Sequence, residues 1–359
     1  MESSRGILRA ALMISWSKFA CCRRLATSAS RPMTLIGRTC MADWEKKHAG
    51  PFAFYLSRLM AESIFPGFKS RMVLVGDQRI SVHVGGSGTP LLLLHGYPQN
   101  HAAWIKLAGP LAKNFTCVIA DLPGYGASSI PVDAPDHESF SKRRMASLFV
   151  SAMASMGYST FSIMGHDRGA RVAYRMALDH PTTIGRVVII EIIPTSDMWK
   201  AFNAEMAMKA YHWSFLAQPF PLPETLIAGD PIFYLEWTLR SWTKEHHLDA
   251  FDSRSLESYR EQIRDPARVH AMCEDYRAGA SIDRRLDLSD KTRGARITAP
   301  LLFVWSKFGF PATTGDPLSL WKAWTQNLSG AEVDCGHFMP EENPDALLAE
   351  AVPFLSAAL

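Results

Sequence analysis

The chain has 359 residues, of which 47% are hydrophobic and 20% charged, and its formal net charge is +3. No run approaches the roughly 18 consecutive apolar residues of a membrane-spanning helix, so we expect no membrane contact. Residues 1–40 hold six Arg and one Lys against one Glu, so they contribute +6 and the remainder of the chain −3. The mildly acidic body has no basic face, which excludes nucleic acid as a partner.

Residues 1–40 are rich in Arg, Ser and Ala and nearly free of acids, a composition typical of organelle transit peptides. An equally good interpretation is an upstream extension without a folded role, because Met41 opens an ordinary start. We expect residues 1–40 to be disordered and outside the fold. The localisation is then cytoplasmic, or mitochondrial or in another organelle if the segment is a transit peptide. Cys117, Cys273 and Cys335 are scattered, which predicts a reducing compartment and no disulfides.

From about residue 72 short apolar runs alternate with helical stretches, a pattern that predicts an α/β fold with a mostly parallel sheet covered on both faces. The expected strands are 72–75, 80–84, 91–94, 116–120, 161–164, 187–193, 301–305 and 331–335. Between them, residues 195–296 lack strand patterns and carry Trp, Met and Phe at helical spacing. We therefore expect a core of 41–194 and 297–359, with 195–296 inserted as a helical cap.

The sequence Gly165-His-Asp-Arg-Gly169 follows one of these strands and opens a helix expected at 170–177. This strand-turn-helix setting is that of the nucleophile elbow of the α/β-hydrolase fold, where flanking glycines permit a very sharp turn. We predict that Asp167 is the nucleophile; the alternative is a simple N-cap of the helix. A carboxylate nucleophile is suited to displacing a leaving group from saturated carbon, which gives an ester that water then hydrolyses. The substrate is therefore expected to carry a halide or an epoxide oxygen.

A second motif, His95-Gly-Tyr-Pro98, follows the strand at 91–94. In this position the fold supplies an oxyanion-hole N–H, and we assign it to the backbone of Tyr97, together with the backbone N–H of Arg168. The alternative is a turn that contains Gly and Pro but has no chemical role.

The general base is expected on the loop after the last strand, where His337 stands in Cys335-Gly-His-Phe338. A carboxylate must orient this histidine. We favour Glu191, because a carboxylate in so apolar a run as Val187–Pro194 needs a reason to be there. Asp316 and a purely structural role for Glu191 are the alternatives. No group of residues has metal-ligand spacing, so neither a metal nor another cofactor is expected.

These motifs resemble the fluoroacetate (haloacetate) dehalogenase family of the α/β-hydrolases from about residue 60 to the C-terminus. Arg168 carries most weight, because similar epoxide hydrolases and haloalkane dehalogenases usually have Trp after the nucleophile. Arg171 lies three residues on, at the same side of the first helical turn. The resemblance implies that both arginines bind a substrate carboxylate. The resemblance also implies that the protein is a homodimer.

By the same resemblance, the halide pocket of the family falls on His212, Trp213 and Tyr276 in the cap. One departure is Glu191, which stands where the family usually carries Asp and is one methylene longer.

The predicted reaction is hydrolysis of 2-haloacids such as fluoroacetate or chloroacetate, through an ester of Asp167, to a 2-hydroxy acid and halide. An epoxide hydrolase is the first alternative; it would use two cap tyrosines, for which Tyr211, Tyr234, Tyr259 and Tyr276 are candidates. The second alternative is a catalytically silent fold that serves as a receptor or interaction module.

Overall fold

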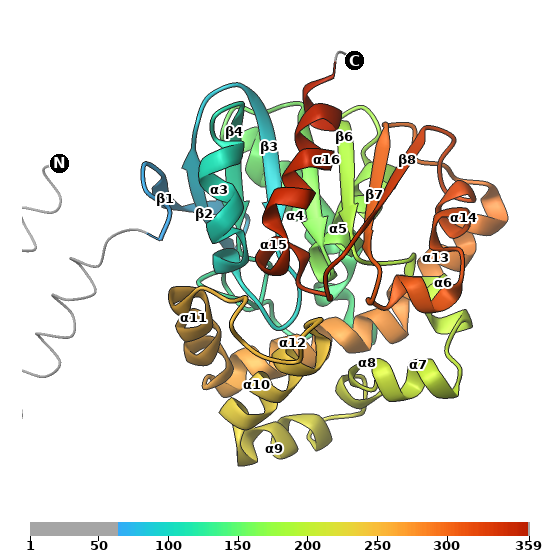
Figure 1. Ribbon diagram of the computed structural model, residues 1–359. Coiled ribbons are helices and arrows are strands. Elements are labelled where there is room, and N and C mark those ends of the chain that lie inside the picture. Colours follow the sequence, from blue (N-terminus) through green and yellow to red (C-terminus); the bar gives the residue numbers. More distant parts are fainter. Residues whose placement is uncertain (1–63, 358–359) are drawn as a thin grey trace, which may run out of the picture. The chain divides into compact units, whose positions relative to one another are not determined.

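The computed structural model describes residues 64–357, so the expectations for residues 1–40 and for the start of the first core segment lie outside the described residues (Figure 1). Its centre is an eight-stranded sheet in the order β1-β2-β4-β3-β5-β6-β7-β8. Pairing is antiparallel between β1 and β2 and between β2 and β4, and parallel from β4 to β8. The strands are β1 (Lys69–Val75), β2 (Gln78–Gly85), β3 (Thr89–Leu94), β4 (Phe115–Ala120), β5 (Phe161–His166), β6 (Ile184–Ile190), β7 (Leu301–Ser306) and β8 (Leu328–Val333). The predicted mostly parallel sheet is confirmed.

All eight expected strands are present, but two of them end earlier than predicted. The strand expected at 187–193 is β6, which ends at Ile190 because Glu191 adopts a φ of 62°, outside the extended region. The strand expected at 331–335 is β8, which ends at Val333, where the N–H of Cys335 turns back to the Val333 carbonyl. Apolar residues follow one position beyond each end, Ile192 and Ile193 after β6 and Cys335 after β8, which is why the predicted strands extend too far.

The apolar run Leu91–Leu94 shows why this sheet needs cover on two faces. All four leucines of the run are fully buried. Successive strand side chains point to opposite faces, so Leu92 and Leu94 join one apolar cluster and Leu91 and Leu93 the other. The first cluster includes α4 (Lys142–Ser155) and α5 (Arg168–Asp179), and the second α3 (Ile105–Leu111) and α16 (Pro344–Ser356). Figure 1 shows α3 and α16 in front of the sheet and α4 and α5 behind it.

A group of helices covers the edge where the parallel strands end (Figure 1, lower part). We call it the cap: α7 (Ala204–Lys209), α8 (His212–Leu216), α9 (Leu222–Gly229), α10 (Pro231–Trp242), α11 (Ser253–Ile263) and α12 (Pro266–Ala280). The segment 195–296 also contains α6 (Thr195–Lys200) and α13 (Ile282–Arg293), which lie against α5. The hydroxyl of Tyr174 on α5 bonds both Thr195 and Asp287, at 2.8 and 3.0 Å. The remaining elements are η1 (His101–Trp104), η2 (Pro135–Phe140), η3 (Pro311–Thr314), α14 (Pro317–Lys322) and α15 (Met339–Glu342).

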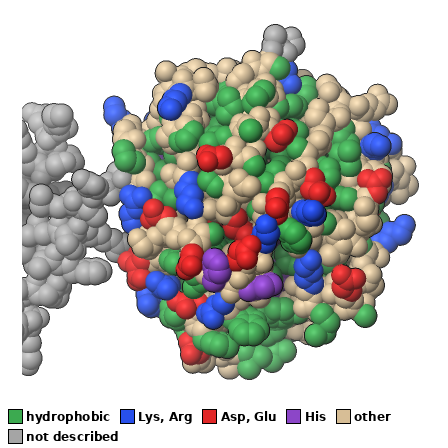
Figure 2. All heavy atoms as spheres, in the orientation of Figure 1, with side chains coloured by type: hydrophobic (Ala, Val, Ile, Leu, Met, Phe, Trp, Pro, Cys, Tyr) green, Lys and Arg blue, Asp and Glu red, His purple; other side chains and the backbone are tan. Residues whose placement is uncertain are grey.

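The surface carries both signs of charge. On the face shown in Figure 2, Lys and Arg side chains are interspersed with Asp and Glu, and hydrophobic side chains gather at its lower end. Among residues 64–357, no helix is both long enough and apolar enough to cross a bilayer, and no cluster of three His, Cys, Asp or Glu could hold a metal ion. Cys117, Cys273 and Cys335 are free and buried.

Candidate active site

The turn between β5 and α5 holds Asp167 in a strained conformation. Its φ of 46° and ψ of −113° lie outside the regions that most residues occupy. The neighbours leave no room for side chains: a Cβ on Gly165 would lie 2.5 Å from the Gly169 carbonyl oxygen, and one on Gly169 would lie 2.3 Å from that of Leu94. Gly96 is equally confined, since a Cβ there would lie 2.4 Å from Cβ of Asp167. Three glycines thus permit the turn that places the carboxylate at the start of α5.

The Asp167 carboxylate is buried and ionised. Its Oδ1 accepts a hydrogen bond of 2.8 Å from the backbone N–H of Tyr97. Burial alone would raise the pKa of Asp167, but the neighbouring His337, Arg168 and Arg171 side chains outweigh it and hold the pKa below its usual value. Asp167 also lines the cavity described below.

His337 is buried, and neither of its ring nitrogens has a hydrogen-bond partner among the described residues. Burial lowers the pKa of His337, although the charge of Asp167 works in the opposite direction. The ring is therefore neutral at neutral pH and able to accept a proton. Phe310 and Trp242 pack around it, with ring centroids at 5.1 and 5.5 Å.

Glu191 follows β6 directly and is completely enclosed. One carboxylate oxygen accepts from the N–H of Ser306 at 2.6 Å, and the other from that of Phe310 at 3.0 Å. Gly309 allows this approach, because a Cβ there would lie 1.5 Å from the carboxylate. Burial raises the pKa of Glu191, and the two N–H donors offset part of that effect. The closest distance from the carboxylate to Nδ1 of His337 is 3.8 Å, which is an ion-pair distance but longer than a hydrogen bond.

Asp316, the alternative partner for the base, has a different position. It is exposed and caps α14, where its carboxylate accepts from the N–H of Ser319 at 3.0 Å.

Arg168 is fully buried and bound to a carboxylate that belongs to the protein. Its Nε and Nη2 donate to the two carboxylate oxygens of Asp275 at 2.9 and 2.8 Å. Asp275 in turn is held by Tyr125 and by Lys142. The Nη1 of Arg168 has no partner, and its guanidinium lies 4.2 Å from the ring centroid of Tyr276. One donor nitrogen of this arginine, Nη1, is thus left over, while Nε and Nη2 hold it in place.

Arg171 is buried one turn further along α5. Its Nη1 donates to the carbonyl of Ile193 at 3.0 Å and to the hydroxyl of Thr195 at 3.1 Å, and its Nε has no partner. The guanidinium lies 4.4 Å from the ring centroid of Trp213. No carboxylate of the described residues binds it, so its charge is available to an anion.

His212, Trp213 and Tyr276 come together above Asp167 from α8 and α12. The ring centroids of His212 and Tyr276 are 5.5 Å apart, and those of Trp213 and Tyr276 6.1 Å. Nδ1 of His212 and the hydroxyl of Tyr276 are buried without a partner. Burial lowers the pKa of His212 and raises that of Tyr276, so both are neutral groups that can donate a hydrogen bond.

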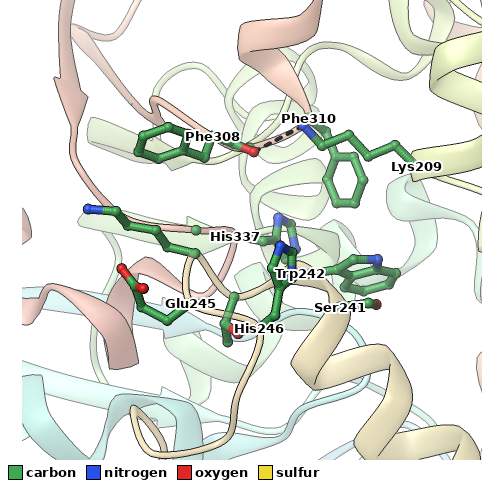
Figure 3. A pocket seen from close by; sticks show the side chains of 12 residues that line it. Lys209, Ser241, Trp242, Glu245, His246, Phe308, Phe310 and His337 are labelled. Atoms are coloured by element: carbon green, nitrogen blue, oxygen red, sulfur yellow. Dashed lines mark hydrogen bonds between the residues drawn. The ribbon is translucent and has the colours of Figure 1, made fainter.

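Asp167, His212 and Trp213 border a small cavity, which we call the inner cavity, with a volume of about 10 Å³. It is lined by Asp167, Arg171, Glu191, Ile192, Ile193, Met198, His212, Trp213, Phe310, Pro311 and His337. A larger outer pocket of about 460 Å³ also reaches His337 (Figure 3). His337 and Phe310 line both spaces, and Nζ of Lys209 donates to the carbonyl of Phe308 at 3.0 Å at the edge of the outer pocket. The histidine therefore stands between the inner cavity and the route toward solvent.

The structure brings all the predicted site residues around the inner cavity or against its walls, although Tyr97, Arg168 and Tyr276 do not line it. Sequence reasoning missed Asp275, which holds Arg168, and Phe310, which separates the inner cavity from the outer pocket. Asp275 is 107 positions from Arg168, so no local pattern connects them. A carboxylate next to a predicted pocket residue was the only available signal.

The mostly parallel sheet, the strained turn at Asp167 after β5, the histidine after β8 and the cap together define an α/β-hydrolase fold. A sequence model of the alpha/beta hydrolase fold family matches residues 89–344. The chain is 42% identical to a fluoroacetate dehalogenase from Burkholderia sp over 82% of its own length and 96% of that protein. We conclude that the chain belongs to the fluoroacetate dehalogenase family of the α/β-hydrolases.

Other relatives agree on the fold. A soluble epoxide hydrolase from Corynebacterium sp. (strain C12) is 28% identical, with 79% of this chain and 96% of that protein covered. Among solved structures, a Nostoc sp PCC 7120 protein assigned as an α/β hydrolase matches with a TM-score of 0.79 at 43% identity, covering 82% of this chain and all of that one. A Pseudomonas aeruginosa protein assigned as an epoxide hydrolase, with bound MFA, has a TM-score of 0.77 at 42% identity, and the match covers 82% of this chain and 98% of that one.

Proposed function

We propose that the protein hydrolyses the carbon-halogen bond of 2-haloacids such as fluoroacetate or chloroacetate and releases halide and a 2-hydroxy acid. The observation that carries this proposal is the pairing of a buried carboxylate nucleophile, Asp167, with Arg171, whose charge no carboxylate of the described residues neutralises. A buried cation beside the nucleophile favours an anionic substrate. The relationship to a fluoroacetate dehalogenase agrees with this substrate class.

In the first step, Oδ2 of Asp167 attacks the carbon that bears the halogen from the side opposite the leaving group, and the configuration at that carbon inverts. The N–H of Tyr97 already holds Oδ1, so Oδ1 becomes the carbonyl oxygen of the ester. Arg171 and the remaining donor of Arg168 bind the substrate carboxylate. The departing halide accepts hydrogen bonds from His212, Trp213 and Tyr276, of which the first and last have unpartnered buried polar atoms.

In the second step, His337 removes a proton from water, and the hydroxide oxygen adds to the carboxylate carbon of the Asp167 ester. The resulting oxyanion is stabilised by the N–H groups of Tyr97 and Arg168, the latter at the start of α5, where helix N–H groups lack internal partners. Collapse of this intermediate releases the 2-hydroxy acid and restores the Asp167 carboxylate with one oxygen from water. Glu191 stabilises the protonated state of His337 during this step.

An epoxide hydrolase has less support. That reaction would use two cap tyrosines with free hydroxyls. The hydroxyl of Tyr259 donates to Glu341, and that of Tyr234 lies 2.9 Å from the hydroxyl of Tyr97. Tyr276 has an unpartnered hydroxyl beside Asp167, while Tyr211 is only partly buried. A receptor without catalytic activity would not need the buried nucleophile, acid and base that converge here.

The test is halide release from fluoroacetate and chloroacetate by the wild-type protein and by Asp167→Asn, with styrene oxide turnover measured in parallel. We expect halide release by the wild type, none by the variant, and negligible diol formation. Chloride without fluoride would restrict the proposal to general haloacids. Diol formation without halide release would replace it with epoxide hydrolysis.

We also propose that the protein acts in the cytoplasm as a homodimer. Several large apolar side chains of the cap region are exposed, namely Phe220, Leu222, Leu226, Phe233 and Trp237. A second copy would remove this apolar surface from water. Light scattering should give twice the chain mass for the wild type and the chain mass for Phe233→Glu, whereas Val132→Glu, at another exposed apolar position outside the cap, should leave the dimer intact.

A further inference from the structure

Three fully buried side chains connect the general base to the interior of the protein. They are Glu341 from α15, Gln99 from the loop after β3 and His166 from the end of β5. Nε2 of His166 lies 2.9 Å from the carbonyl oxygen of His337, and its Nδ1 lies 3.2 Å from the side-chain oxygen of Gln99. The amide nitrogen of Gln99 contacts the carboxyl group of Glu341, which also receives the hydroxyl of Tyr259 at 3.0 Å.

We propose that Glu341, Gln99 and His166 position the general base through the backbone carbonyl of His337, and that Glu341 does so as a neutral carboxylic acid. The catalytic consequence rests on the proposed function, in which His337 activates water. The proposed charge state stands independently of that function.

Counting donors and acceptors leaves two possible arrangements. The carbonyl of His337 can only accept, so Nε2 of His166 must donate to it. If His166 is neutral, its Nδ1 is an acceptor and cannot face the oxygen of Gln99. The amide of Gln99 then turns by 180°, which changes its shape very little, and donates to Nδ1. Its oxygen now faces Glu341, which must supply a proton.

The other arrangement keeps the amide as it stands. Gln99 then donates to an ionised Glu341 and accepts from a doubly protonated His166. Both arrangements hold the same number of protons, and they differ only in whether one proton lies on Glu341 or on His166. Which arrangement forms therefore depends on whether burial permits a charged Glu341 and a charged His166, or favours the neutral form of both.

Burial disfavours charge on both groups. It lowers the pKa of His166 to about 3, with the charge of His337 acting in the same direction and Asp167 against it. It also raises the pKa of Glu341 well above its usual value, despite the hydrogen bond from Tyr259. The neutral pair is the state that both shifts favour.

The charged neighbours of Glu341 do not reverse this balance. Lys106 on α3 favours the ionised form, but its ammonium donates to the backbone carbonyls of Glu341 and Ala250, both at 2.7 Å, and not to the carboxyl group. Glu342, the next residue on α15, disfavours a second negative charge. Tyr259 on α11 donates to one carboxyl oxygen and leaves the other to carry the proton toward Gln99.

Uncharged Glu341 and His166 side chains are compatible with the proposed attack by Asp167. His166 directly precedes Asp167, and an imidazolium there would hold the nucleophile's negative charge and make the carboxylate less reactive. A neutral His166 supports the loop of His337 without this effect. The backbone N–H of His337 donates to the carbonyl of Trp242 at 2.8 Å. The hydrogen-bond chain from Glu341 therefore holds the backbone carbonyl of a residue whose N–H is already held.

The charge state can be read from the wild-type protein by ¹⁵N NMR of its histidines, with the His166 signals assigned by their loss in His166→Gln. We expect a neutral imidazole protonated at Nε2 between pH 6 and 8. Infrared difference spectra should show a carboxylic-acid C=O band that Glu341→Gln removes. An imidazolium at His166, or no acid band attributable to Glu341, overturns the proposal. Neither measurement needs a substrate, so failure of the dehalogenase proposal would not be confused with failure here.

The positioning role is tested by comparing Glu341→Gln with Glu341→Leu. A glutamine can donate to Gln99 and accept from Tyr259 as the neutral acid does, so kcat should stay within about twofold of the wild type. Leucine breaks the chain, and kcat should fall about tenfold to a hundredfold with KM changed by less than about threefold. Glu350→Gln, an exposed change on α16, is the control for loss of a negative charge. Equal losses in both Glu341 variants contradict the neutral acid; if the leucine variant does not fold, the glutamine variant and the spectra still decide.

Discussion

The carboxylate of Glu191 lies 3.8 Å from Nδ1 of His337, while both its oxygens are already bound by the backbone N–H groups of Ser306 and Phe310. The loop after β7 is where this fold more commonly carries the acidic residue that orients the histidine. Here the end of β7 and that loop instead supply the N–H donors that hold Glu191, which follows β6. The extra methylene of Glu relative to Asp is thus accommodated by a loop that closes around it, with Gly309 against the carboxylate.

Glu191→Gln should slow hydrolysis of the ester without slowing its formation. The glutamine side chain would place its NH₂ group against the backbone N–H of Ser306 or of Phe310. It also carries no negative charge to stabilise a protonated His337. Steady-state kcat should fall about 10²- to 10⁴-fold, while rapid-quench measurements still show a burst of about one halide per active site. Loss of the burst as well would place Glu191 in the first step.

Gly309→Ala should reproduce this behaviour without removing a charge. Its Cβ would lie 1.5 Å from the carboxylate of Glu191, so the carboxylate or the loop must move. We expect kcat to fall about tenfold or more, since small displacements of catalytic groups are costly. Gly109→Ala in α3, where no atom lies within 4 Å of the new Cβ, is the matched control and should behave as the wild type. Equal activity of the two variants would show that the Glu191 carboxylate need not be held in place.

His337→Ala should stop the reaction at the ester. Because attack by Asp167 does not need the base, one halide is released per chain, and the intermediate accumulates. Intact-protein mass spectrometry should show the added carboxymethyl group after chloroacetate, located on the peptide that contains Asp167. The double variant Asp167→Asn/His337→Ala should show none. A modification elsewhere in the chain would contradict Asp167 as the nucleophile.

The two arginines should differ when replaced by methionine. Arg171 has no carboxylate partner, so Arg171→Met should raise KM for chloroacetate about tenfold to a hundredfold, the effect of losing a charged hydrogen bond. Arg168→Met breaks a buried ion pair with Asp275 and should also lower the free energy of unfolding by about 3 kcal/mol. Urea unfolding and steady-state kinetics separate the two effects. Equal stability of the two variants would mean that the Asp275 contact contributes little.

Ester hydrolysis should remain fast at neutral pH and decline only in acid. Burial lowers the pKa of His337 below 6.5, so its neutral, proton-accepting form dominates at pH 7. The negative charge of Asp167 raises that pKa in the free enzyme, and esterification removes this charge. The acid limb of single-turnover hydrolysis should therefore lie at lower pH than the titration of His337 in the resting enzyme. A limb at the same or higher pH would contradict His337 as the base.

The sequence alone determined the presence of the strands and the sharp turn at Asp167, because these depend on local rules. An apolar run predicts a buried strand, and two glycines around an aspartate predict a sharp turn whatever surrounds them. It could not determine where β6 ends, because the positive φ of Glu191 is imposed by donors from Ser306 and Phe310, more than a hundred residues away.

Only the tertiary structure decided how the polar groups are shared. Arg168, predicted as a substrate ligand, donates most of its hydrogen bonds to Asp275. Arg171 instead donates to a backbone carbonyl and forms no ion pair with a carboxylate of the described residues. The hydrogen-bond chain from Glu341 to His337 likewise joins three motifs that are far apart in the sequence. Hydrogen bonds act over about 3 Å and depend on which side chains the fold brings together, so residue type and spacing cannot reveal their partners.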